Sequence, residues 1–272
     1  MILSFGSAAP VLAVPSAVAL AGYVIAAVFS RRAGGWLRVA WFVAWVAHGL
    51  AIVADVAGVG GAVPGARFGF APALSATLWL VLAVHAVESR LVPLPGVRRT
   101  LALIGALVVM LAWWFPGESR PHAGSPWAPL HWVLGIASYG LFGAAVLHAA
   151  LLSNAERKMR LKLPGASPAP LGLPLLRLEK LTFRFVEAGF GVLSATLLLG
   201  WWFAEPWRWD HKAVFSILGW LVFAGLLAGR HAFGWRGRRA TGGVYAGAVL
   251  LMLGYVGSRF VLEVVLQRSA TG

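Results

Sequence analysis

The chain has 272 residues, of which 60% are hydrophobic and only 12% are charged, and its mean hydropathy is +0.79. Soluble domains are about half apolar and a quarter charged, so this composition excludes a water-soluble domain and indicates an integral membrane protein. The net charge of +14 does not indicate a nucleic-acid partner, because the basic residues separate apolar runs instead of gathering on one face. The chain contains no cysteine, which excludes disulfides, thiolate metal sites and covalent thiol intermediates.

Eight apolar runs follow one another along the chain. A helix needs roughly 17 to 25 residues to cross a hydrocarbon core of about 30 Å, and most of the runs reach that length. A membrane barrel would alternate apolar and polar residues, which these runs do not do. We therefore predict an all-α polytopic integral membrane protein with about eight transmembrane helices, forming a single membrane domain over residues 1–272. The runs are 8–30, 40–59, 70–87, 101–115, 130–152, 185–203, 213–227 and 240–262.

Two of these runs, the fourth and the seventh, are shorter than a full span. We expect them to extend into flanking residues such as Thr100 and Trp207. The longest connection, residues 153–184, contains the Pro- and Gly-rich stretch LPGASPAPLGLP followed by the amphipathic stretch LLRLEKLTFR. It is predicted to be a cytoplasmic linker that includes a helix lying at the membrane interface.

The basic residues predict the orientation of the chain in the membrane. Lys and Arg near span ends are retained on the cytoplasmic side, and most of the 23 follow the first, third, fifth and seventh runs. Both termini are therefore expected on the periplasmic side of a bacterial inner membrane. The six basic residues on the opposite side are Arg67, Arg120, Arg208, Lys212, Arg259 and Arg268.

One group of residue types on the predicted periplasmic side suits a haem. His131 begins the fifth run, and the connection FAEPWRWDHK lies between the sixth and seventh runs. An imidazole can bind the iron, Trp207 and Trp209 can cover the flat ring, and Arg208 can pair with an acid group of the macrocycle. The alternative is that these tryptophans belong to the aromatic belt found at most membrane interfaces.

A second polar position, His48, falls in the middle of the second run. A buried imidazole in a membrane needs a partner, which is either a functional group or an interhelical hydrogen bond. Asp55 follows seven residues later on the same helical face, about 10 Å along the axis, so it is expected to line the same cavity without touching His48. His122 and His211 are further candidates on the periplasmic side. Structural roles are expected for His85, His148 and His231.

The stretch WRWDHKAVFSILGWLV, residues 207–222, resembles the tryptophan-rich WWD signature of the cytochrome c assembly family, the group that contains CcsA, ResC and CcmC. HWVLGIASYGLF, from His131, resembles the family segment with a haem-ligating periplasmic histidine. GWRGRRA, from Gly234, resembles the basic loop before the last helix. The likeness covers about residues 40–265 and is closer still to the YpjD branch. The matching signature positions are Trp207, Trp209, Asp210, Lys212, Ser216 and Trp220.

The chain also departs from the family pattern at residues that the family uses for chemistry. His211 and Ala213 replace the proline and glutamate of the signature, and Ala228 stands where the family has a histidine. The second periplasmic histidine has no counterpart after the last run. The resemblance therefore implies one family ligand, His131, and leaves the other axial position to be filled from this chain, for which we favour His48.

The resemblance implies a haem-handling protein that binds or presents haem at the periplasmic face for cytochrome c assembly. The alternative is a membrane assembly or structural protein that keeps the fold without haem. Either protein would work by binding, and an enzyme is not expected. Its predicted partners are membrane lipid, haem and cytochrome c assembly proteins, with no nucleic acid. The predicted cofactor-binding residues are His131, Trp207, Trp209, Asp210, His48 and Arg208, with His131 and His48 as ligands of the iron.

Overall fold

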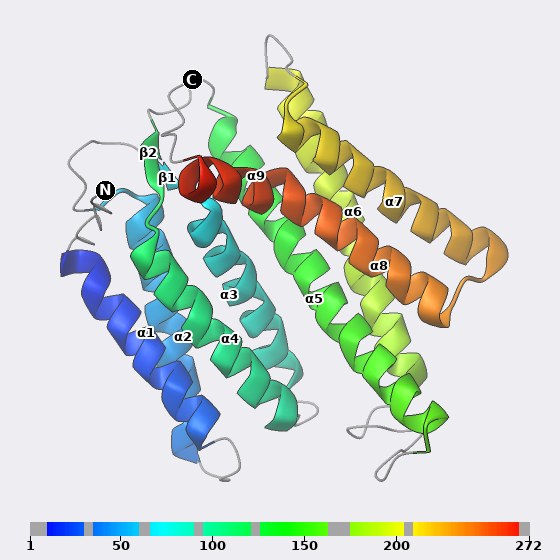
Figure 1. The fold of residues 1–272 in the computed structure, drawn as a ribbon, viewed down its shortest axis with the longest axis horizontal. Helices are drawn as coiled ribbons and strands as arrows, with labels where there is room; N and C mark the ends of the chain where they lie inside the picture. Colours follow the sequence, from blue (N-terminus) through cyan, green and yellow to red (C-terminus); the bar gives the residue numbers. More distant parts are fainter. Residues whose placement is uncertain are drawn as a thin grey trace. The chain divides into compact units, whose positions relative to one another are not determined.

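The structure is a computed structural model, and within its described residues eight helices are long and apolar enough to cross a membrane. This confirms the predicted all-α polytopic fold. The described residues are 10–29, 35–59, 66–89, 95–120, 126–162, 175–203 and 209–266. The helices (Figure 1) are α1 Pro10–Val28, α2 Gly35–Val56, α3 Phe70–Glu88, α4 Pro95–Trp114, α5 Ala128–Arg160, α6 Leu175–Phe203, α7 His211–Phe233 and α8 Gly237–Met252.

The two short runs reach full helical length in different ways. Helix α4 extends through Thr100 to Pro95, as expected. Helix α7 does not extend to Trp207; it begins at His211 because Asp210 caps it, and it gains its length at the other end, to Phe233. There Gly234 adopts a left-handed conformation with φ 63°, and its N–H donates to the carbonyl oxygen of Arg230, which ends the helix.

The long connection predicted at 153–184 is largely helical. Residues 153–160 complete α5, and 175–184 form the first turns of α6, continuous with the membrane span. Glu179, which the sequence placed on an interfacial helix, is buried and accepts a hydrogen bond from Arg230 at 2.8 Å. The part of the linker at 163–174 lies outside the described residues.

The last span is not a regular α-helix along its whole length. After α8, two π-helical turns at Leu253–Gly257 and Val261–Val265 flank the short α9, Ser258–Phe260. A π turn contains more residues than an α turn, and such turns occur frequently at functional sites. The irregular segment carries Arg259, whose side chain is buried.

The chain forms two compact units. Residues 1–124 belong to the first unit together with 259–272, and residues 125–258 form the second. One boundary between the units therefore falls between β2 and α5, and the other falls between Ser258 and Arg259.

The first unit contains α1 to α4 (Figure 1), with α1 packed along α2 and α4, and α3 along α2 and α4. A close crossing brings α1 and α2 together at Gly22, where an added Cβ would lie 2.7 Å from that of Ala44. Small residues allow such close approach between membrane helices. Two short antiparallel strands, β1 Ala66–Phe68 and β2 Glu118–Arg120, join the α2–α3 connection to the end of α4.

The second unit contains α5 to α8, with α5 packed along α6 and α7 along α8. Its core is built on the rings of Phe142 and Phe223, which stack with centroids 3.9 Å apart. Gly189 and Gly247 face these rings, and an added Cβ would approach them to 3.0 Å and 2.6 Å. The Tyr139 hydroxyl donates to the carbonyl oxygen of Leu251, so a polar bond also ties α5 to α8.

Candidate functional site

His131 lies in the first turn of α5, in the second unit, and its side chain is half-buried. Its Nδ1 lies 3.0 Å from the backbone carbonyl oxygen of Thr196 on α6. A carbonyl oxygen can only accept, so Nδ1 carries the proton and donates it. In the neutral imidazole, Nε2 then keeps its lone pair, which is the form that binds a metal. No described residue forms a hydrogen bond with this Nε2.

The surroundings of His131 hold the ring in place. Gly200 lies one turn beyond Thr196 on α6, and a Cβ built there would be 2.8 Å from Cε1 of His131. The ring of Phe203 meets the imidazole edge-on, with centroids 5.5 Å apart. The imidazole therefore fits against α6 only because residue 200 has no side chain.

Exposed tryptophans are concentrated where α6 ends and α7 begins. Trp201, Trp202 and Trp209 are 68%, 79% and 73% exposed. Trp201 and Trp202 lie in the last turn of α6, the helix that contacts His131. These indoles provide large apolar surface at the end of α6 and the start of α7, and they also fit an interfacial aromatic belt, so both interpretations of Trp209 remain open.

The WRWD connection is only partly described. Trp207 and Arg208 lie outside the described residues, as does His122. Asp210 has a clear local role, because its Oδ1 accepts a hydrogen bond of 2.8 Å from the backbone N–H of Ala213 and so caps α7. This cap explains the aspartate of the motif through helix structure, and its role in cofactor binding stays a prediction.

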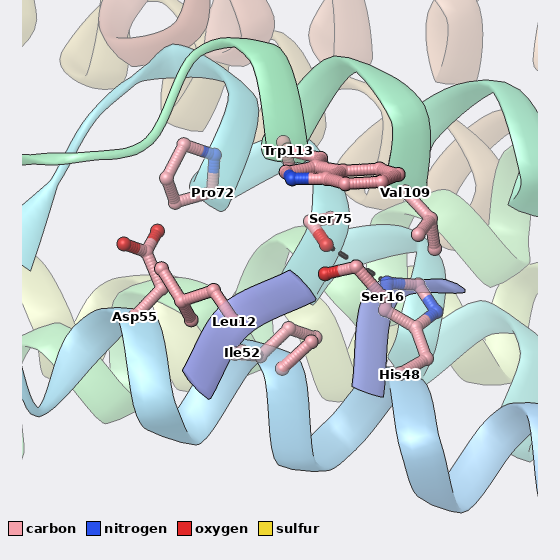
Figure 2. Close-up of a pocket in the computed structure, with 11 residues that line it drawn as sticks. Leu12, Ser16, His48, Ile52, Asp55, Pro72, Ser75, Val109 and Trp113 are labelled. Carbon is pink, nitrogen blue, oxygen red and sulfur yellow. Dashed lines mark hydrogen bonds between the residues drawn. The ribbon is translucent and has the colours of Figure 1, made fainter. Parts of the chain in front are cut away.

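His48 lies in α2, in the first unit, and is only 1% exposed. Its Nδ1 is 3.1 Å from the hydroxyl of Tyr23 on α1, and its Nε2 is 2.8 Å from the hydroxyl of Ser75 on α3. Figure 2 shows the bond to Ser75. Both ring nitrogens are occupied, so binding of iron by His48 would require one of these bonds to break. The prediction that His48 and His131 share one iron stays a prediction.

Asp55 and His48 line the same pocket in the first unit (Figure 2), which confirms the expectation from their seven-residue spacing. The Asp55 carboxylate accepts from the backbone N–H of Gly117 at 3.3 Å and lies 3.6 Å from Nη1 of Arg67. Among the described residues there is no cluster of three or more His, Asp or Glu side chains that could hold a metal ion.

Several partners in these sites were not identified from the sequence. Tyr23 and Ser75 belong to helices other than that of His48, and a single hydroxyl in an apolar run carries no spacing signal. Gly200 stands out in the sequence as a glycine one helical turn after Thr196 in an otherwise bulky apolar run. No local pattern, however, indicates that it faces His131.

Comparison with known proteins places the chain in a family. Residues 36–266 match the model of the family described as "Cytochrome C assembly protein". The chain belongs to this cytochrome c assembly family. The "Inner membrane protein YpjD" of Escherichia coli (strain K12) is 30% identical over 244 residues, which cover 86% of this chain and 90% of that protein. This relative and the eight apolar helices support a multi-pass inner membrane protein.

Other members of the family share a shorter segment. The "Cytochrome c biogenesis protein CcsA" of Synechococcus sp. (strain JA-3-3Ab) is 31% identical over 109 residues, which are 36% of this chain and 32% of that protein. The protein of the same name from Prochlorococcus marinus (strain MIT 9303) is 33% identical over 86 residues, 30% of this chain and 27% of that protein. No solved structure matches the chain. The comparisons confirm both the family and the YpjD branch suggested by the sequence.

Proposed function

We propose that this protein works in cytochrome c assembly by binding haem at the periplasmic face of the inner membrane, with His131 as a ligand of the iron. Family membership supports the role in cytochrome c biogenesis. The observation that carries the haem assignment is the hydrogen bond from Nδ1 of His131 to the carbonyl oxygen of Thr196. It fixes the tautomer that leaves Nε2 able to bind iron.

The residues around His131 fit one axial ligand and an apolar ring. A bound haem would supply redox-active iron and two acid groups. The chain's own contribution would be to hold the iron with His131 and to cover the ring with exposed indoles such as Trp209. Arg208 would pair with an acid group. The chain has no cysteine, so covalent attachment of haem would need the thiols of a partner protein, and the protein acts by binding and presentation without catalysing a reaction.

The second candidate is a membrane assembly or structural protein without haem. The double hydrogen bonding of His48 favours it, because this side chain is fully satisfied without a metal. The replacement of the family histidine by Ala228 favours it as well.

The test is the Soret absorption of the protein purified from haem-sufficient cells. Haem binding through His131 predicts a Soret band that is lost in His131→Ala and regained by His131→Gly supplied with free imidazole. His231→Ala is the matched control. Nδ1 of His231 also donates to a backbone carbonyl oxygen, that of Leu227, but this side chain is exposed and lies in the last turn of α7. A folded wild-type protein without a Soret band would favour the second candidate.

The aromatic part of the proposal has its own test. Replacing Trp207 and Trp209 together with Ala should lower the haem occupancy while the protein remains inserted and folded. Trp114→Ala serves as the control, since this indole is 56% exposed but ends α4, in the first unit. Equal haem content in the double variant and the control would assign Trp207 and Trp209 to the interfacial belt.

The periplasmic location is tested by reporter fusions. A reporter after Gly272 should be active in the periplasm, and one inserted near Ala166 should be active in the cytoplasm, because the basic residues favour that orientation. A reporter on the opposite side would place His131 at the cytoplasmic face and contradict the proposed site of haem presentation.

A further inference from the structure

A small pocket lies inside the first unit, between α1, α2, α3 and α4 (Figure 2). The space open to the centres of water molecules is about 20 Å³. Apolar side chains such as Leu12, Val109 and Trp113 form much of the wall. Four polar residues face the same space: Ser16, His48, Asp55 and Ser75.

The polar groups on one side of the pocket form a chain of hydrogen bonds. The His48 ring joins the hydroxyls of Tyr23 and Ser75. A neutral imidazole has one donor and one acceptor nitrogen, so one hydroxyl donates to the ring and the other accepts from it. In either tautomer, Ser75 retains a proton or a lone pair that this bond does not use. Ser75 can therefore make a further hydrogen bond into the pocket.

The polar group on the other side is the carboxylate of Asp55, a residue whose side chain is 9% exposed. Oδ2 accepts from the N–H of Gly117. Oδ1 lies 3.6 Å from Nη1 of Arg67, beyond hydrogen-bond distance, and no described residue donates to it. The helical rise places Asp55 about 10 Å along α2 from His48, so the two side chains do not bond directly.

The pocket has the size and polarity of a water site. A buried polar atom without a hydrogen-bond partner lowers the stability of the fold by about 1–3 kcal/mol. More than one polar group faces this space. One water molecule needs roughly 10–15 Å³ of such volume and two to four polar partners. The pocket therefore has room for one water molecule or at most two, and it is far too small for an organic cofactor.

We propose that this pocket is a hydrated proton-exchange site. One or two water molecules donate to Oδ1 of Asp55 and either accept from or donate to the Ser75 hydroxyl, and so connect His48 with the carboxylate beside the β1–β2 hairpin. Each exchange passes one proton into the water and another out of it, so no net charge moves. The buried imidazole of His48 then exchanges its N–H proton with solvent through Asp55, although its own surface is closed.

The site is tested by X-ray radiolytic labelling of the full-length protein in H₂¹⁸O, in which bound water generates hydroxyl radicals that oxidise adjacent side chains. Leu12 and Val109 line the pocket and are 5% and 2% exposed, whereas Leu82 and Val81 in α3 do not line it and are 0% and 5% exposed. Water in the pocket predicts labelling of Leu12 and Val109 about tenfold faster than of Leu82 and Val81. Equal labelling of Leu12 and Leu82, and of Val109 and Val81, would overturn the proposal. This comparison needs no variant.

Two variants separate the water from the connection to His48. Ser16→Val fills the pocket with apolar atoms and should reduce the labelling of Val109 to that of Val81; persistent labelling would overturn the assignment to this pocket. Ser75→Ala removes the link but leaves the space, so labelling should persist. In Ser75→Ala, the exchange of the His48 N–H proton with solvent, measured by NMR of ¹⁵N-histidine, should slow about tenfold. Unchanged exchange in Ser75→Ala would overturn the proposed route.

Discussion

Gly200→Ala tests whether the position of His131 depends on the absence of a side chain on α6. The new Cβ would lie 2.8 Å from Cε1 of His131 and 3.3 Å from Nδ1. An ordinary contact begins near 3.4 Å, so the ring must move by at least about 0.6 Å away from α6. The accepting oxygen of Thr196 is on the same helix, so this movement weakens the hydrogen bond that fixes the tautomer.

The expected magnitude follows from three contributions. Overpacking costs about 1–3 kcal/mol. Loss of the His131 bond costs about 0.5–1.5 kcal/mol. Replacing a glycine inside a helix by alanine stabilises the fold by about 0.5–1 kcal/mol. Gly191→Ala is the matched control, because Gly191 is on the same helix and an added Cβ meets nothing within 4 Å. This variant should therefore show only the stabilisation that comes from replacing a helical glycine.

The assay is thermal unfolding of both variants, followed by tryptophan fluorescence at one scan rate in one detergent. Gly200→Ala should unfold at least roughly 3 °C below Gly191→Ala, since the overpacking and the lost bond together separate the two variants by at least about 1.5 kcal/mol. If haem is bound, the Soret band should weaken in Gly200→Ala alone. Equal unfolding temperatures for the two alanine variants would refute the reasoning, because they would show that the imidazole can move without loss.

Two further predictions concern polar bonds in the second unit. Arg230→Ala should lower the free energy of unfolding by about 1–3 kcal/mol, because Glu179 loses the partner that lies 2.8 Å away; the loss is less than for a fully buried ion pair. In the double variant that also carries Glu179→Gln, a smaller loss would confirm this cause, and an equal loss would contradict it. Trp220→Phe should lower the free energy of unfolding by about 1 kcal/mol, because the indole N–H donates to the Ser194 hydroxyl at 2.8 Å. Trp202→Phe, at an exposed position, should leave that free energy unchanged. Both variants are measured by thermal unfolding.

The spans could be predicted because their signal is local. A run of apolar residues long enough to cross the hydrocarbon core specifies a helix without reference to the rest of the chain. The end of α5 was harder to predict, because Arg157 and Lys158 lie beyond the apolar run, which stops at residue 152, but are good helix formers. Hydropathy therefore predicted a linker where the helices continue beyond the apolar segment.

The site could be predicted only in part, for a related reason. His131 and the WRWD stretch carry a family pattern, which identified them as candidates. The partners of His48 come from two other helices, and which faces of these helices meet is decided by packing. Spans that are apolar on nearly every face give no periodicity to indicate that choice. The Tyr23–His48–Ser75 bonds and the pocket beside them therefore required the structure.

The first unit is not contiguous in the chain, and this has a consequence for biosynthesis. Its buried Arg259 lies 4.0 Å from Glu118, and the N–H of Phe70 donates to Glu263, yet residues 125–258 separate the two parts of the unit in the sequence. At about 5–20 residues per second, translation of that intervening segment takes roughly 7–27 s. During this interval α1 to α4 are in the membrane without the contact between Glu118 and Arg259. A ribosome that stalls before residue 259 would therefore leave an incomplete first unit that lacks both of these contacts.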